Sequence, residues 1–179
     1  MPKILDKPRE GILAAAKSEL AEKGVEGFNV RDVAKISGVS IGTIYNYFDN
    51  KFTLVNKVVE EDWNRRKEEC QKSIVAPASI DEVVEGVYQL VLGFSSDNRA
   101  ILKALNDGND IMVIGGSEQH NRFRKDVSLL LEDGFAKFGK HLSEEELIFI
   151  GENILYTAIR QEVTIALVKR SVNCLIASH

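Results

Sequence analysis

The chain has 179 residues, of which 44% are hydrophobic and 28% charged, a composition that excludes the disordered, collagen-like and disulfide-rich classes. Its formal net charge of -4 excludes a protein that coats nucleic acid indiscriminately, because such binding neutralises many phosphates. Through Lys57 the chain nevertheless carries nine Lys or Arg against seven Asp or Glu, so basic charge is concentrated at the front. Any contact with nucleic acid is therefore expected to be local.

Other functional classes lack their usual residue patterns. Cys70 and Cys174 have no metal-ligand spacing and form no disulfide framework, and the three histidines are scattered, so neither a metal site nor a cofactor is expected. No nucleophile elbow, phosphate loop or dinucleotide fingerprint occurs, which disfavours an enzyme. The chain shows no export signal and no run of about 18 apolar residues, so we expect a cytoplasmic protein without a membrane segment.

The first part of the chain predicts three helices. The three prolines, at positions 2, 8 and 77, leave long stretches free for helix, which favours an all-α fold. Apolar residues recur at helical spacing over 9–23, and Gly24 supplies a stop. Asn29 can cap a second, short helix that ends at Ser37–Gly38, and Ser40 can cap a third that runs through Phe48.

The rest of the chain predicts further helices. We expect an amphipathic connecting helix over about 52–71 and, after the break at Pro77, a capping box that opens a helix at Ser79 and carries it to about Gly93. The remaining expected elements are a helix over 98–106, a loop over 107–117, a helix over 117–140 and a last helix opened by the capping box of Ser143 with Glu146.

The last of these helices is apolar almost all round. Its apolar residues exceed one stripe, so part of its surface needs a partner beyond its own domain. We therefore expect a homodimer formed through the last two helices, 117–140 and the one that begins at Ser143.

Residues 30–48 have the pattern of a helix-turn-helix. Gly38 stands where the turn between helices needs a positive φ, and Ala34 is small where the helices cross. Ile44 and Phe48 are spaced to anchor the second helix. Its outward face then carries short or flat groups suited to the major groove of DNA.

Residues 38–54 resemble the TetR family of bacterial regulators. They match its signature Gly-Val-Ser-x-Gly-Thr-x-Tyr-x-x-Phe-x-x-Lys-x-x-Leu position by position, and with the first helix the resemblance covers about 50 residues. It implies an all-α protein with a three-helix DNA-binding domain, residues 1–50, followed by a helical ligand-binding and dimerisation domain, residues 51–179. It further implies a repressor that an unknown small-molecule effector releases from a palindromic, double-stranded operator.

The resemblance also assigns roles to single residues. It implies that Tyr47 and Lys51 contact phosphates and that Asn29 and Ser40 present helix amino termini to phosphates, whereas Gly42, Thr43 and Tyr45 approach bases. From its chemistry, Asn46 can hydrogen-bond adenine. Because residues 40–50 contain no Lys or Arg, base readout is expected to depend on methyl contacts and DNA shape.

The second domain offers candidates for an effector pocket, namely aromatic and polar side chains that such a pocket would need. The alternative, that the aromatic ones are simply core, stays open. The candidates are Trp63, Tyr88, Phe123, Asn153, Tyr156 and Arg160. The helix over about 52–71 is expected to act as the lever between the pocket and the DNA-binding domain. The alternative to an operator-binding regulator is a co-regulator or ligand-binding protein of the same fold that acts through a protein partner.

Overall fold

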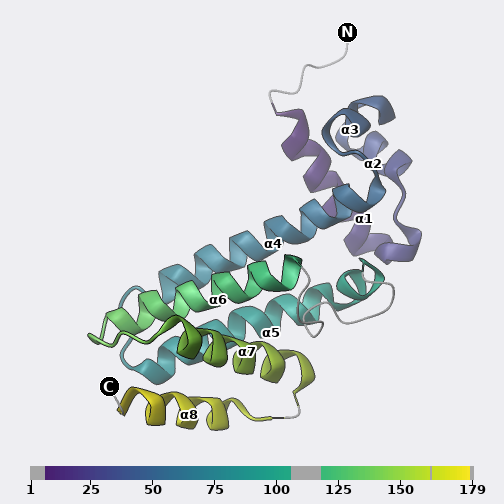
Figure 1. The fold of residues 1–179 in the computed structure, drawn as a ribbon. Coiled ribbons are helices and arrows are strands. Elements are labelled where there is room, and N and C mark those ends of the chain that lie inside the picture. Colours follow the sequence, from purple (N-terminus) through teal and green to yellow (C-terminus); the bar gives the residue numbers. More distant parts are fainter. Residues whose placement is uncertain (1–6, 106–117, 162, 178–179) are drawn as a thin grey trace. The chain divides into compact units, whose positions relative to one another are not determined.

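The chain is all-α, as the sequence predicts. A computed structural model describes residues 7–105, 118–161 and 163–177, and within them it contains helices and no strand (Figure 1). The expected loop over 107–117 lies outside the described residues. The helices are α1 (Pro8–Gly27), α2 (Val30–Ser37), α3 (Ile41–Tyr47), α4 (Lys51–Ser73), α5 (Ile80–Leu105), α6 (Glu118–Ala136), α7 (Glu144–Arg160) and α8 (Ile165–Ala177).

These helices form two compact units. The first contains residues up to Asp62 together with the end of α5 from Ala100, and the second begins at Trp63 and contains the rest of the described chain. The boundary expected after residue 50 coincides with the start of α4, whereas the boundary between the compact units falls inside α4. No described helix is both long enough and apolar enough to cross a bilayer.

The first unit is organised around one apolar cluster. Residues from the inner faces of α1, α2 and α3 and from the first turns of α4 build it, and Ile12, Val33 and Leu54 are completely buried there. Gly24 has a φ of 67° and interrupts the helical backbone of α1, which confirms the stop predicted at that position. The helix resumes briefly to Gly27 before the chain turns into α2.

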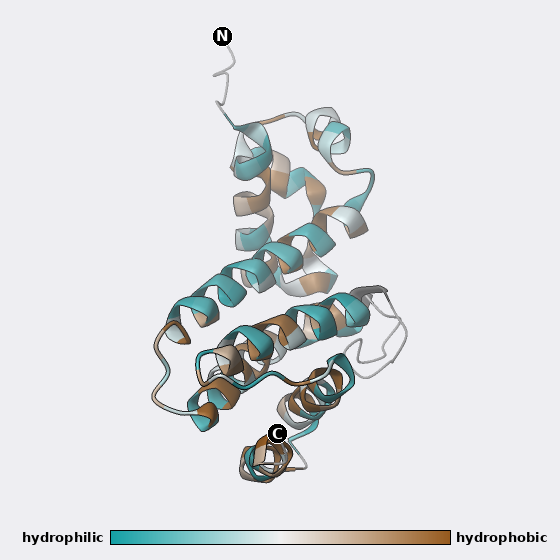
Figure 2. Ribbon diagram, turned by 60° about the vertical axis from the view of Figure 1, so that its left-hand side comes forward, coloured by the Kyte–Doolittle hydropathy of each residue, from teal (hydrophilic) through white to brown (hydrophobic). Residues whose placement is uncertain are grey.

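The second unit buries an aromatic group and packs α7 against α6 and α8 (Figure 1). Trp63, Phe94 and Phe123 are buried with ring centroids 4.6 to 5.3 Å apart. Figure 2 shows that α8, beside the C-terminal label, is largely hydrophobic. Part of this surface stays exposed, since Phe149 on α7 and Leu167 on α8 are about half accessible.

The expected break between two helices over 79–106 was wrong, because α5 is one continuous helix. The polar residues near the expected break bond to the helix itself: Ser95 Oγ donates to the Leu92 carbonyl at 3.1 Å, and Asn98 Nδ2 donates to the Phe94 carbonyl at 3.1 Å. Gly93 faces α4, where a Cβ would stand 2.9 Å from an Arg66 guanidinium nitrogen. This atom is the end of a flexible side chain, and Gly93 has no positive φ, so the glycine continues the helix and does not end it.

Two other helix ends also differ from expectation. The last helix is split into α7 and α8, because Gln161 adopts a φ of 55° and its N–H donates to the Thr157 carbonyl at 3.0 Å. Helix α6 ends at Ala136, before the expected Lys140, and the chain then turns through Gly139, whose φ is 67°. The capping box predicted for Ser143 and Glu146 is confirmed.

Candidate nucleic-acid interface

The first unit contains the helix-turn-helix that the sequence predicts. Asn29 Oδ1 accepts a hydrogen bond from the Arg31 N–H at 2.9 Å and caps α2. At the other end of α2, Gly38 adopts the left-handed conformation (φ 69°), and its N–H donates to the Ala34 carbonyl. Ser40 begins α3 two residues later, so the two helices are joined by a tight turn whose backbone groups are satisfied locally.

Helix α3 is capped and anchored by its own residues. Ser40 Oγ accepts from the Thr43 N–H at 3.0 Å and lies 2.8 Å from the Thr43 hydroxyl. Ile44 and the cap residue Phe48 are buried, so one side of the helix is fixed in the core of the first unit. The opposite side is therefore presented to solvent in a defined orientation.

The exposed side of α3 gathers most of the residues predicted to contact DNA. Tyr45 and Tyr47 are each 46% exposed, and within the described part of the chain their hydroxyls have no hydrogen-bond partner. Gly42 and Asn46 are also exposed, whereas Thr43 is half-buried beside the cap. A Cβ at Gly42 would meet only Ser40 Oγ, at 3.7 Å, so the fold itself does not require glycine there.

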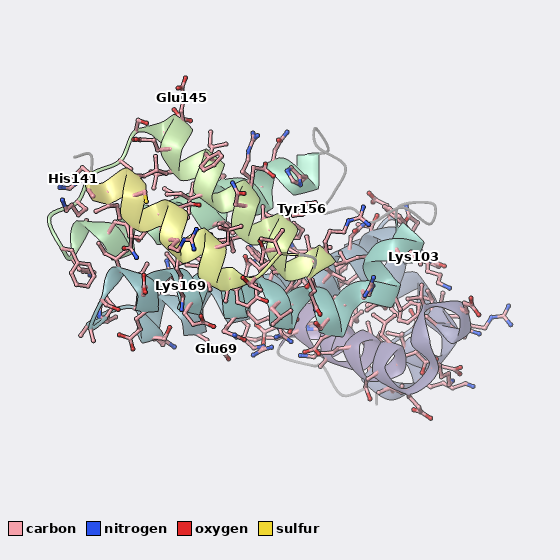
Figure 3. The ribbon with its side chains drawn as sticks, turned by 90° about the horizontal axis from the view of Figure 1, so that it is seen from below. Glu69, Lys103, His141, Glu145, Tyr156 and Lys169 are labelled. Atoms are coloured by element: carbon pink, nitrogen blue, oxygen red, sulfur yellow. The ribbon has the colours of Figure 1, made fainter. Side chains whose placement is uncertain are left out.

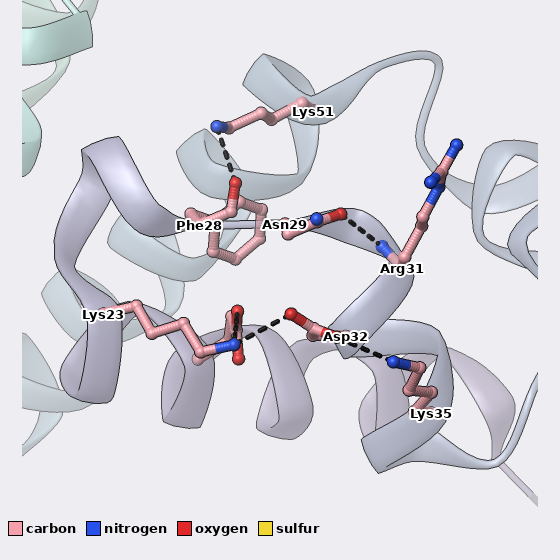
Figure 4. Close-up of polar contacts among 8 residues, drawn as sticks. Lys23, Phe28, Asn29, Arg31, Asp32, Lys35 and Lys51 are labelled. Carbon is pink, nitrogen blue, oxygen red and sulfur yellow. Dashed lines mark hydrogen bonds and ion pairs between the residues drawn. The ribbon is translucent and has the colours of Figure 1, made fainter.

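Lys51 holds together parts of the first unit that are distant in sequence. Its ammonium donates a hydrogen bond to the Phe28 carbonyl at 2.7 Å and lies 5.4 Å from the centroid of the Phe28 ring (Figure 4). The first turn of α4 is thus tied to the residue that precedes the cap of α2. Since an ammonium has three N–H donors, a phosphate contact by Lys51 stays a prediction compatible with this bond.

Cations near α2 differ in what they contact. Lys23 and Lys35 both pair with Asp32, whereas the exposed Arg31 side chain points away from this group (Figure 4) and has no ion-pair partner among the described residues. Hydrogen bonds from Lys23 and then Lys35 lower the pKa of Asp32 below its ordinary 3.8. The hydrogen bond to Asp32, followed by the ion pair with Glu19, raises the pKa of Lys23. None of Lys23, Asp32 and Glu19 was predicted from the sequence, because the contact between Lys23 and Asp32 forms only when α2 packs on α1.

The structure divides the six predicted effector residues between core and surface. Trp63 is completely buried, packs on Phe123 and donates its indole N–H to Asp126 Oδ2 at 2.7 Å. Tyr88 is half-buried on α5. The other three lie exposed along α7, with Tyr156 labelled in Figure 3, and they are Asn153, Tyr156 and Arg160. A role in effector binding stays a prediction for all six.

A groove of ligand size lies elsewhere in the second unit. It has a volume of about 690 Å³ and runs along α6 and α7, with Arg124 and Lys125 among its polar residues and Leu129 and Ile148 among its apolar ones. None of the six predicted residues lines it. Only the packing of α6 on α7 forms this groove, so no periodicity within either helix could have identified it.

Two short, capped helices joined by a tight turn are typical of helix-turn-helix proteins when the second helix buries one face and exposes polar and aromatic side chains on the other. Residues 12–58 match the family described as "Bacterial regulatory proteins, tetR family". Residues 12–58 therefore form a helix-turn-helix domain of the TetR type, which confirms the resemblance of residues 38–54.

Curated relatives are similar to this chain in sequence, and solved structures are similar to it in fold. An HTH-type transcriptional regulator of Staphylococcus aureus (strain USA300) is 28% identical over 110 residues, which are 62% of this chain and 60% of that protein, so the chain spans less than two thirds of this relative. A transcriptional regulator of Streptomyces coelicolor A3(2) shares the fold with a TM-score of 0.63, at 19% identity over 95% of this chain and 98% of that one. FadR from Bacillus subtilis, solved in complex with stearoyl-CoA, has a TM-score of 0.54 at 21% identity over 95% and 98% of the two chains.

Proposed function

We propose that this protein is a ligand-responsive repressor that binds a palindromic operator as a homodimer. The observation that carries the proposal is the exposed face of α3, on a helix whose other face is buried. Two tyrosines stand there beside an exposed glycine, and their hydroxyls have no hydrogen-bond partner among the described residues. Helices of this kind enter the major groove, and a twofold dimer then reads two half-sites about one helical turn apart.

The residues of the interface divide into two roles. Tyr47 and Lys51, together with the helix starts at Asn29 and Ser40, contact phosphates and set the position of the unit on the duplex. Base edges are approached by Gly42, Thr43, Tyr45 and Asn46. Glycine at 42, which the fold does not need, leaves room for the backbone of α3 to come close to the bases.

The second unit supplies dimerisation and effector binding in this proposal. Exposed Phe149 and Leu167 flank a surface hollow of about 430 Å³ on α7 and α8, and a partner helix pair can cover this apolar surface. The stearoyl-CoA complex of FadR, a protein of similar fold, supports a small-molecule effector. Helix α4 contains residues of both units and is the proposed lever, so effector binding favours a dimer geometry that no longer fits successive major grooves.

Selection of bound duplexes from a random pool of about 30 base pairs tests operator binding. We expect a palindromic sequence that binds at least about a thousandfold more tightly than scrambled DNA, with an affinity that falls steeply with salt. Substitution Tyr47→Phe removes one hydroxyl and is expected to weaken binding to all sequences, whereas Thr43→Val is expected to change which sequence is preferred.

The alternative function, a co-regulator that acts through a protein partner, is supported by the absence of Lys and Arg from residues 40–50. A co-regulator of the same fold would bind a ligand or a protein partner and would enrich no duplex from the pool. That outcome would reject the operator-binding proposal.

A further inference from the structure

Helix α1 buries a carboxylate on its apolar side. Ile12, Ala16 and Leu20 line the side that packs into the first unit, and Glu19 lies among them with only 1% of its side chain exposed. A carboxylate removed from water is strongly unfavourable unless a cation or hydrogen-bond donors compensate it. The position therefore requires a partner that the surrounding apolar residues cannot supply.

Lys23, one helical turn further along α1, is that partner. Its Nζ lies 3.0 Å from Glu19 Oε1, and among the described residues no other cation pairs with Glu19. The same Nζ donates to Asp32 Oδ2 at 2.8 Å, and Asp32 belongs to the first turn of α2 (Figure 4). One ammonium thus joins a buried carboxylate of α1 to a carboxylate of α2.

The position of this contact matters for the helix-turn-helix. Helix α1 packs on α2 and also contacts α3, so the placement of α2 on α1 influences how α3 is presented. Lys35 pairs with Asp32 as well, at 3.2 Å, but its side chain is 78% exposed and it does not reach Glu19. Of the two lysines, Lys23 alone connects the helices.

We infer that Lys23 is a positioning residue for the DNA-binding unit: it fixes the start of α2 on α1 and so orients α3, and it does not itself bind phosphate. The test of this inference by DNA affinity rests on the operator binding proposed above, whereas its test by thermal unfolding does not. Loss of Lys23 leaves Glu19 as a buried charge without a partner, a state that removal of Glu19 in the same chain relieves.

Three variants of the full chain test this inference, namely Lys23→Met, Lys35→Met and the double variant Glu19→Leu with Lys23→Met. Lys35→Met is the matched control, because it also removes a lysine that pairs with Asp32 but not one that pairs with Glu19. We expect Lys23→Met to lower the thermal midpoint by at least about 5 °C, Lys35→Met by less than about 2 °C, and the double variant to recover most of the loss. Equal midpoints for Lys23→Met and wild type, or no recovery in the double variant, would overturn the inference.

Operator affinity across salt separates positioning from phosphate contact. The double variant, although folded, should bind the selected operator about tenfold more weakly with an unchanged salt dependence, because the link to Asp32 is still missing. If Lys23 contacted phosphate, its loss from both half-sites would reduce the slope of log affinity against log salt by about two. If the pool yields no operator, the proposed function fails, and the thermal midpoints still decide whether Lys23 joins the helices.

Discussion

The two compact units differ in how far along the chain their polar contacts reach. In the first unit the caps at Asn29 and Ser40 bond to backbone groups two and three residues away. In the second unit Trp63 bonds to Asp126, 63 residues away, and Asn173 Nδ2 donates to Asp81 Oδ1 across 92 residues. The starts of α2 and α3 are therefore set by local signals, although Lys51 also links the first unit across 23 residues. The larger unit depends more on contacts that exist only after its helices have packed.

The largest effect should come from truncation of the central aromatic group of the second unit. Trp63→Ala removes a completely buried ring that packs on Phe94 and Phe123, and we expect it to lower the free energy of unfolding by about 3–5 kcal/mol. Urea unfolding followed by circular dichroism measures this. The control Trp63→Phe keeps most of the packing and should lose clearly less; equal losses would show that packing of the ring does not dominate.

A smaller effect is expected from the polar partner of the same tryptophan. Asp126 accepts hydrogen bonds from the Trp63 indole at 2.7 Å and from the Lys67 ammonium at 2.9 Å. Asp126→Ala leaves a buried indole N–H without an acceptor, which should reduce the free energy of unfolding by about 1–3 kcal/mol. The exposed Asp133 on the same helix serves as the matched control, and a similar loss for Asp133→Ala would contradict the importance of the long-range contact.

The capping serines test whether local contacts count equally in both units. Ser40 caps α3 in the first unit and Ser143 caps α7 in the second, each by accepting a backbone N–H of its own helix. We expect Ser40→Ala and Ser143→Ala each to cost about 1 kcal/mol in urea unfolding. Ser18, exposed inside α1, should tolerate the same change with almost no loss, and a large difference between the two caps would show that tertiary context modifies them.

The smallest effect concerns acid stability and involves one carboxylate in each unit. Lys23 and Lys35 lower the pKa of Asp32, and Gln89 followed by Lys169 lowers that of Glu85. A carboxylate whose pKa is lower in the folded than in the unfolded protein stabilises the fold at pH values above its ordinary pKa, which is 3.8 for Asp32 and 4.5 for Glu85. This stabilisation is lost as the pH falls through the pKa of the folded state. Asp32→Asn and Glu85→Gln should therefore each reduce the difference in unfolding free energy between about pH 6 and pH 3. An unchanged difference would argue against these interactions.

Local structure in the first unit follows from the sequence by itself. Asn29, Gly38 and Ser40 predict the ends of α2 and α3, and the structure confirms them, because a cap or a left-handed glycine acts on backbone groups only a few residues away. The same reasoning confirms the capping box at Ser143. The resemblance to the TetR family was likewise evident from the consecutive residues 38–54, and the match over residues 12–58 confirms it for this part of the chain.

Tertiary structure decided what depends on residues far apart in the chain. Gly93 looked like a helix end, but it has no positive φ and α5 continues through it. Gln161 ended α7 without any sequence signal for a left-handed residue. Trp63 and Phe123 were candidates for an effector pocket and lie together in the core. Lys23 was not singled out from the sequence, because its contact with Asp32 forms only when α2 packs on α1. The physical reason is the same throughout: backbone hydrogen bonds at a helix end close over a few residues, whereas burial and ion pairing depend on neighbours that only packing supplies.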